Sequence, residues 1–362
     1  MSGPSPLQKT FPEPETDSSA MPDNAPPGAN EAARKTLNEI LVGQINTLIG
    51  YRRGVLESGE PDAIHKLRVT TRRLQASLDM LQSESDDERA HRVNAIIKKL
   101  KDRLRRSRRK LANLRNTDVF LEMLADSTRK SGRRGKRYEL FAAILRARRD
   151  RYDEESRAYL KKRDFDDFVE ILDRVNSEFL NDHLTETRPS EVADESSGAK
   201  EKARRISGPA VSQRVAARAA ERLDERFREF QRLALASHPG SHPAELHQVR
   251  IAAKRLRYLL ELLSMMQVGE FEKELRWLRA VQEKIGNWHD LHAIEEEIIG
   301  TVSRRSFMRE HLAGSAEMLA IAANFRSRRI PLARNLFPIK PPRSLAVVTN
   351  RLVKALRREA HA

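Results

Sequence analysis

Two segments of the sequence place histidine and arginine at the same spacing. The first runs from His65 to Leu81 (HKLRVTTRRLQASLDML) and the second from His247 to Leu263 (HQVRIAAKRLRYLLELL). In each, the histidine is followed at +3 by arginine, at +7 by lysine or arginine, at +8 by arginine and at +9 by leucine. Arginine, lysine and protonated histidine are side chains that hold phosphate and other anions. A repeat of this long period indicates two related structural units.

Plotted on a helix, each segment separates into a basic stripe and an opposite apolar stripe. The basic stripe of the first segment consists of His65, Arg68 and Arg72, with Arg73 at its border. That of the second segment consists of His247, Arg250 and Lys254, with Arg255 and Arg257 at its borders. The apolar stripes consist of Leu67, Leu74, Leu78 and Leu81 and of Leu256, Leu260 and Leu263. Cations one turn apart repel one another, and a solvated helix face usually mixes signs. We therefore expect both basic stripes to bind an anionic partner, although a solvated face is the simpler alternative.

A further basic run, KKLKDRLRRSRRK, extends from Lys98 to Lys110. Its cations point in all directions around a helix, so one ligand can contact only some of them. Arg103, Arg106 and Lys110 share one face, and we predict that these three extend the anion site. The remaining cations of the run are interpreted as solvated surface.

Composition narrows the classes of partner. The 362-residue chain has a net charge of +16, and its first 32 residues carry one lysine against five carboxylates. The rest is therefore strongly basic, which favours nucleic acid, polyphosphate or an anionic membrane as partner. The absence of cysteine excludes disulfides and thiolate chemistry. No signal peptide and no run of 18 apolar residues is evident, so we expect a soluble cytoplasmic protein.

The distribution of proline predicts the domain organisation. Seven of the 16 prolines lie in residues 1–32, whereas none lies between Asp62 and Arg188, which should be helical. Pro61 and Pro243 each stand four residues before a repeated histidine, at the expected start of a helix. We expect a disordered acidic tail (1–32), a first helical half (33–182), a flexible linker (183–207), a second helical half (208–336) and a C-terminal basic helix (337–362). That last helix either docks on the second half or lies on a membrane surface.

The duplicated pattern resembles the CHAD family, the conserved histidine α-helical domain, over about residues 33 to 335. A second matched pair carries the resemblance further: LANLRNTDV (Leu111 to Val119) and IGNWHDLHA (Ile285 to Ala293). The chain departs from the family pattern at Asn116, where aspartate is usual and where Asp290 aligns in the second half. We expect Asp118 and Asp290 to serve as helix caps or internal ion-pair partners.

The resemblance implies an all-α fold with two pseudo-symmetric antiparallel helical bundles, formed by duplicated half-domains around a central basic groove or pore. It further implies that this groove binds inorganic polyphosphate and that the protein is associated with polyphosphate granules, together with granule-associated proteins. No strand with alternating Glu-x-Glu-x-Lys is present, so the chain resembles the standalone form of the family. On this basis we expect no catalytic residue, no metal site and no cofactor.

Three alternatives remain open at the level of sequence. A nonspecific nucleic-acid binder would also need basic charge, although aromatic residues for stacking make up only 5%. A metal-dependent phosphohydrolase would use the His289–Asp290 dipeptide, but no further ligands stand at a convincing spacing. An interaction protein could coat a granule or a membrane through its basic surface.

The repeated histidines carry a prediction of their own. Phosphate would favour their protonated form, so binding is expected to strengthen below about pH 6.5. The alternative is that both histidines pack at a bundle interface.

Overall fold

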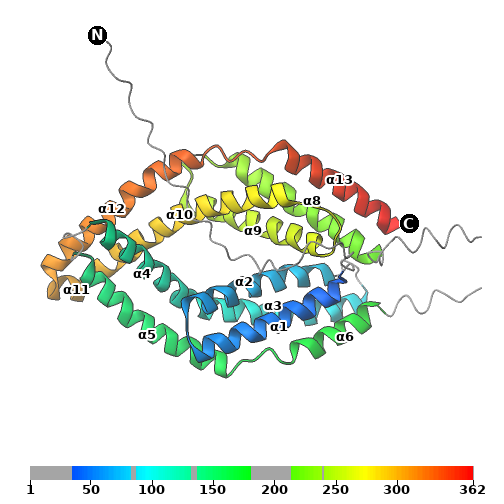
Figure 1. The fold of residues 1–362 in the computed structure, drawn as a ribbon, viewed down its shortest axis with the longest axis horizontal. Helices are drawn as coiled ribbons and strands as arrows, with labels where there is room; N and C mark the ends of the chain where they lie inside the picture. The colour runs from blue at the N-terminus through cyan, green and yellow to red at the C-terminus, as the bar shows by residue number, and fades with distance from the viewer. Residues whose placement is uncertain (1–34, 83–86, 132–136, 181–212, 239, 362) are drawn as a thin grey trace, which may run out of the picture. The chain divides into compact units, whose positions relative to one another are not determined.

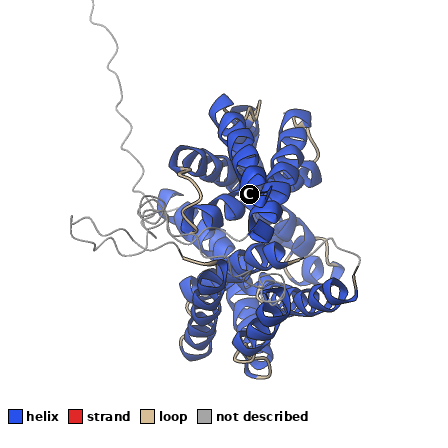
Figure 2. Cartoon of the chain, turned by 90° about the vertical axis from the view of Figure 1, so that its right-hand side faces the viewer, coloured by secondary structure: helices blue, strands red, loops and turns tan. Residues whose placement is uncertain are grey.

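A computed structural model describes residues 35–82, 87–131, 137–180, 213–238 and 240–361. These residues form helices and connecting loops without a strand (Figure 2), which confirms the expected all-α class. The tail at 1–32 and the linker at 183–207 lie outside the described residues. The helices are α1 (Leu37–Glu57), α2 (Pro61–Leu78), the 3-10 helix η1 (Asp79–Leu81), α3 (Glu88–Lys110), α4 (Ala112–Ser131), α5 (Glu139–Lys161), α6 (Phe168–Leu180), α8 (Gln213–Ala236), α9 (Pro243–Met265), α10 (Glu272–Val302), α11 (Arg305–Glu310), α12 (Leu312–Leu336) and α13 (Arg343–His361).

The helices that carry the repeat begin where the sequence predicts. Pro61 is the first residue of α2 and Pro243 the first residue of α9. Proline suits this position because its fixed φ is helical and the first N–H groups of a helix lack partners inside the helix. His65 and His247 are each the fifth residue of their helix, so both lie close to its N-terminus.

The described helices belong to one compact unit, Arg34–Ala362. In Figure 1, α1 to α6 lie together, and α8 to α10, α12 and α13 lie together across from them. The two groups meet where α2 contacts α9 and where α4 contacts α10. The two copies of the repeat therefore face each other across the junction between the groups.

Two apolar cores hold the helices in place. The main core includes the predicted apolar stripes, and all seven of their leucines are at most 3% exposed. The second core lies farther along α4, α5, α10 and α12, with Phe120, Phe141, Ile294 and Phe325 among its members. Since side chains from both halves of the sequence enter each core, the halves are packed against each other rather than merely linked.

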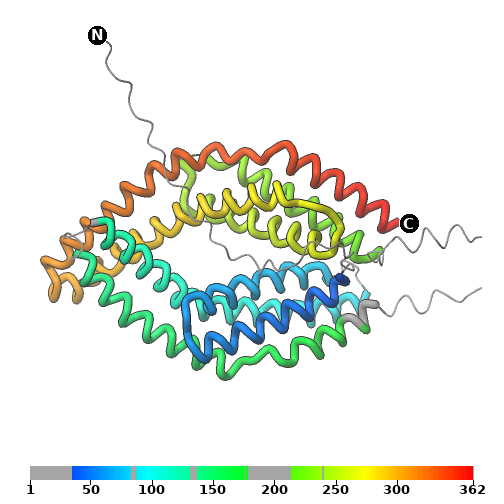
Figure 3. The backbone as a smooth tube through the Cα atoms, in the orientation of Figure 1, coloured from blue at the N-terminus to red at the C-terminus, as the bar shows by residue number. Residues whose placement is uncertain are grey.

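The C-terminal part of the chain is also packed. Helix α12 runs back along α10, and the short α11 lies at the turn that connects the two (Figure 3). After the prolines at 341 and 342, α13 packs along α8, where Leu345, Val353 and Leu356 are buried. This contact is the docked arrangement of the two that the sequence allowed. No helix among the described residues combines the length and apolar character needed to cross a membrane.

Candidate functional site

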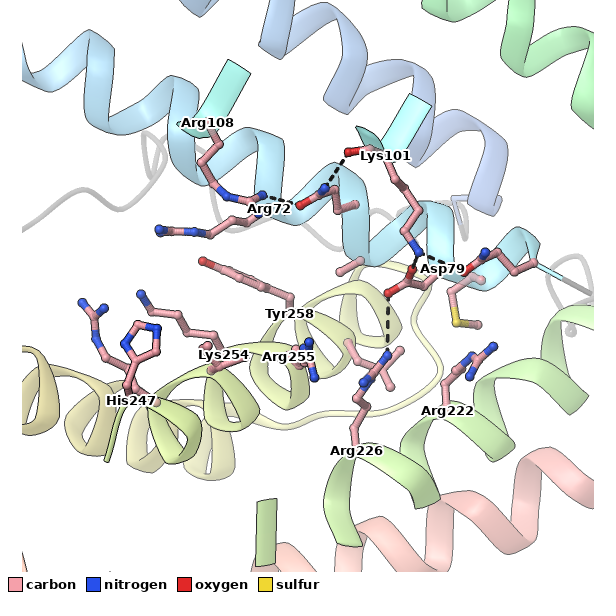
Figure 4. A pocket seen from close by; sticks show the side chains of 17 residues that line it. Arg72, Asp79, Lys101, Arg108, Arg222, Arg226, His247, Lys254, Arg255 and Tyr258 are labelled. Atoms are coloured by element: carbon pink, nitrogen blue, oxygen red, sulfur yellow. Dashed lines mark hydrogen bonds and ion pairs between the residues drawn. The ribbon is translucent and has the colours of Figure 1, made fainter. Parts of the chain in front are cut away.

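Helices α2 and α9 border a cavity of about 570 Å³, to which the basic stripe of α2 contributes Arg72 and that of α9 contributes His247, Arg250, Lys254 and Arg255. Helices α3 and α8 and the 3-10 helix η1 complete its walls (Figure 4). The cationic or titratable nitrogen side chains that line it are Arg72, Lys101, Arg108, Arg222, Arg226, His247, Arg250, Lys254 and Arg255. Asp79 is the single carboxylate among the lining residues. A cavity with this charge balance is suited to an anion larger than one phosphate.

One end of the cavity holds cations that have no internal partner; we call it the unpaired end and define it by Arg72, Arg250 and Lys254. Within the described part of the chain, none of the three makes a hydrogen bond or an ion pair. The Nε atom of Arg250 is fully buried, and its guanidinium group lies against α10 beside Gly286. Arg72 and Arg250 repel each other and oppose the protonation of Lys254, and the opposing carboxylate of Asp290 forms no ion pair with them, so an anion in this place would lower their energy.

The pKa values of the basic side chains in and beside the cavity are lowered by burial and by this repulsion. Burial, followed by the charges of Arg72 and Arg250, lowers the pKa of Lys254 to about 6. Burial and the neighbouring arginines also lower the pKa of Arg68 to about 9 and that of Arg108 to about 10. A free Lys254 is therefore largely neutral near pH 7, and a bound anion would favour its protonation.

The other end of the cavity is internally compensated; we call it the paired end and define it by Asp79, Lys101 and Arg226. Asp79 forms an ion pair with Lys101 and lies 3.8 Å from Arg226. The Nζ atom of Lys101 also donates a hydrogen bond of 2.9 Å to Gln82. Figure 4 shows Asp79 between these two cations, away from His247 and Lys254. The two ends of one cavity thus differ in net charge.

Carboxylates outside the cavity compensate further arginines. Glu225 lies 2.9 Å from Arg222, and Glu229 lies 3.1 Å from Arg255 and 3.5 Å from Arg226. These α8 carboxylates compensate the charge of arginines that line the cavity, which reinforces the contrast with the unpaired Arg72, Arg250 and Lys254.

The predicted histidines take different places. His247 lines the cavity, and its ring lies 5.5 Å from that of His289 on α10. His65 is solvent-exposed and is not among the lining residues. Desolvation lowers the pKa of both, helped by Arg115 and Arg72 at His65 and by His289 and Arg250 at His247. Each is therefore neutral near pH 7 in the free protein.

Several predicted contact residues lie outside the cavity. Arg68 donates a hydrogen bond to the backbone oxygen of Arg108 and does not line the cavity. Arg73 and Arg257 both pair with Glu261 on α9, at 3.5 and 3.2 Å. These three arginines support the walls in the free protein, so any contact between them and a ligand stays a prediction.

The basic run on α3 supplies different cations from the three predicted. Arg103 pairs with Asp167 at 2.7 Å and covers the ring of Phe168, on the side facing α6. Arg106 and Lys110 are exposed and do not line the cavity. Lys101 and Arg108, seven residues apart and therefore on one face, line it instead. The spacing of Lys101 and Arg108 could have indicated that they share a face of α3, but the sequence does not tell which face of α3 meets α2.

The second matched motif is structural in the first half of the chain. Asp118 is buried and pairs with Arg149 at 2.8 Å. Asn116 lines a second cavity of about 410 Å³ between α4, α5 and α10, where Arg148 is already paired with Glu297. In the second half, His289 and Asp290 lie 3.6 Å apart. No group of three or more metal-ligating side chains occurs among the residues that the structure places.

The fold and the cavity together define an all-helical protein in which two repeated basic helices border one positively charged cavity. The chain belongs to the CHAD domain family, whose sequence profile matches residues 39–298. This confirms the resemblance drawn from the repeated histidine pattern.

Two solved structures share the fold. The CHAD domain from the plant Ricinus communis is 18% identical, with a TM-score of 0.52, and the match covers 95% of this chain and 97% of that one. PptA from Streptomyces chartreusis is 20% identical, with a TM-score of 0.51, and the match covers 84% of this chain and 97% of that one. At these identities the likeness shows the fold alone. No curated protein matches the chain in sequence.

Proposed function

We propose that the protein binds inorganic polyphosphate in the cavity between α2 and α9 and that it does so without catalysis. The observation that carries the proposal is the unpaired end, where Arg72, Arg250 and Lys254 form no ion pair and no hydrogen bond in the described part of the chain. A run of linked phosphates supplies closely spaced negative charge at this place. Membership of the CHAD family is compatible with such a ligand.

The shape and chemistry of the lining favour polyphosphate over nucleic acid. Tyr258 is the only phenylalanine, tyrosine or tryptophan that lines the cavity among the described residues, and it is just 6% exposed. Binders of single-stranded nucleic acid usually stack bases on accessible aromatic rings. Arginine forks and lysine ammonium groups, which dominate here, contact phosphate and need no base.

The proposal extends to the internal symmetry of the fold. Each of the two helices that carry the repeat brings repeat cations to the cavity, Arg72 from α2 and Arg250 and Lys254 from α9, and each buries an apolar face in the main core. We therefore interpret the two groups of helices as duplicated bundles around a shared basic groove. A single anion bridging both repeats would explain why each repeat keeps the same basic spacing.

The cellular role follows from binding alone. A protein with this site would be held at polyphosphate granules by its affinity for their main component. Contacts with other granule proteins and with nucleic acid would then depend on its exposed cations.

Calorimetric titration with long-chain polyphosphate tests the proposal, at about 150 mM salt and with excess duplex DNA present. The test variant is Arg72→Gln/Arg250→Gln, which removes two charges from the unpaired end. Its affinity should fall by at least about a hundredfold, because a charge-assisted contact contributes about 1.5–3 kcal/mol. Its fold should be retained, because the two guanidinium groups repel each other in the free protein.

The matched control is Lys273→Gln/Lys284→Gln, which removes the same charge from exposed positions on α10 outside the cavity. Its affinity should stay within about twofold of the unchanged protein, since exposed charges contribute little. Equal losses in the two variants, or displacement of polyphosphate by the DNA, would contradict the proposal and favour diffuse charge attraction. Release of orthophosphate in the presence of Mg²⁺ would contradict the absence of catalysis.

A further inference from the structure

Asp79 is an anion in a cavity that is otherwise lined by cations and neutral groups. It lies at the junction of α2 and η1, where the chain turns toward α3. Its side chain is one quarter exposed, so it faces the cavity rather than the core. Its two partners, Lys101 from α3 and Arg226 from α8, come from opposite walls.

In the free protein, Asp79 relieves repulsion at the paired end. Arg226 is also paired with Glu225 and Glu229 of α8, whereas Asp79 is the one carboxylate that pairs with Lys101 among the described residues. The unpaired end keeps most of its repulsion, because no carboxylate of the described residues forms an ion pair with Arg72, Arg250 or Lys254, and Asp290 acts on the last two only from beyond ion-pair distance. A bound phosphate therefore gains its full attraction at the unpaired end.

At the paired end, a phosphate has to compete with a carboxylate that is already in place. A phosphate group that displaced Asp79 would exchange one ion pair for another and would leave the Asp79 carboxylate beside a second negative charge. The net gain from this exchange is small. The paired end should therefore contribute little to affinity while Asp79 is charged.

On the basis of the proposed function, we propose that Asp79 is a specificity-determining residue that confines the phosphates to the unpaired end and so weakens the preference for long chains. The residues from His247 to Leu259 of α9 that line the cavity span about 18 Å of helix. A short oligophosphate needs only the unpaired end, whereas a long chain can extend past Tyr258 toward Lys101 and Arg226 (Figure 4). Removing the charge of Asp79 would make that extension favourable.

The experiment compares the affinities of tripolyphosphate and long-chain polyphosphate for the full chain and for Asp79→Asn. Asparagine keeps the size of the side chain and its ability to accept a hydrogen bond from Lys101. The ratio of long-chain to tripolyphosphate affinity should rise on the order of fivefold. The statistical advantage that a long chain has from its many equivalent binding registers enters the ratio of both proteins equally, so it cancels when the two ratios are compared.

A double-mutant cycle locates the effect. In Asp79→Asn/Lys101→Gln the gain in the ratio should disappear, because the phosphates gain affinity through the released Lys101. Asp126→Asn is the matched charge control, since Asp126 pairs with Lys130 on α4 and does not line the cavity. This control should leave the ratio as it is. Thermal unfolding of each variant shows that it is folded, and Asp79→Ser replaces Asp79→Asn where it is not.

An unchanged ratio in Asp79→Asn would overturn the inference. A gain that persists in the double variant would overturn it as well, because Asp79 would then act only through the general field of the cavity. Neither outcome affects the proposed function, which depends on Arg72→Gln/Arg250→Gln. Failure of the unchanged protein to bind either phosphate chain would instead overturn both.

Discussion

Lys254 is the residue whose chemistry should respond most to a bound anion. It faces Arg72 of α2 and Arg250 and Arg257 of α9, with Asp290 of α10 as the one opposing charge among its strongest interactions. Its pKa of about 6 in the free protein should rise when phosphates approach. Binding then takes up a proton at any pH between the free and the bound pKa, so affinity increases as the pH falls through that range.

We therefore expect polyphosphate affinity to rise by up to about tenfold for each unit that the pH falls from 8 toward 6, after which the contribution of Lys254 levels off. Titrations in buffers of different ionisation enthalpy measure the proton uptake directly. In Lys254→Met the uptake near pH 7.5 should decrease. The pKa values of His65 and His247 also lie below the usual 6.5 in the free protein, so a bound anion would favour their protonation as well. Equal proton uptake in Lys254→Met and the unchanged protein would contradict this assignment.

Glu261 joins three helices next to the cavity. Its buried carboxylate lies 3.5 Å from Arg73 of α2, 3.2 Å from Arg257 of α9 and 3.6 Å from Arg279 of α10. Its side chain is 12% exposed, and loss of its charge would leave Arg257, which is 15% exposed, without its ion-pair partner and beside two more exposed arginines. Loss of the Glu261 charge should therefore weaken the contact between α2 and α9, on which the width of the cavity depends.

Glu261→Gln should lower the free energy of unfolding by about 2–4 kcal/mol, as measured by urea denaturation. Arg279→Gln is the informative companion, because it removes the most exposed of the three partners and should cost less than about 1 kcal/mol. Polyphosphate should restore part of the lost stability in Glu261→Gln by supplying negative charge to the same region. Equal stability of Glu261→Gln and the unchanged protein would show that the carboxylate is not what joins the helices.

The helices and their buried faces follow from local sequence, whereas the pairing of charges does not. The helical period of 3.6 residues puts Leu74 and Arg72 on different faces of α2 and predicts which of them is buried. Nothing in that period reveals that Glu229 of α8 lies beside Arg255, 26 residues away, or that Asp79 meets Arg226. Which of the predicted cations are paired and which are unpaired therefore depends on residues distant in sequence. Arg222 and Arg226 were not predicted as part of the site because they lie on α8, which carries no copy of the repeat.

At the scale of the whole molecule, the net charge of +16 and the cavity should act on different steps of binding. The long-range field draws a polyanion toward the surface and increases the association rate, and salt screens this field. The unpaired end is partly buried, where salt screens less, and its contacts determine how slowly the ligand leaves. The affinity for polyphosphate is then the ratio of an association rate, which depends on the net charge of the molecule, to a dissociation rate, which depends on the contacts at the unpaired end.

Binding kinetics at about 50 and 300 mM salt can separate the two contributions. We expect the association rate to fall by about tenfold over this range, with a much smaller change in the dissociation rate. Arg72→Gln/Arg250→Gln should show the opposite pattern, with dissociation faster by at least about tenfold and association nearly retained. Duplex DNA is too wide to enter a cavity of about 570 Å³ and contacts exposed cations only, so the same double variant should bind DNA as the unchanged protein does. A variant that loses DNA and polyphosphate in parallel, through slower association, would mean that surface charge rather than the cavity holds the ligand.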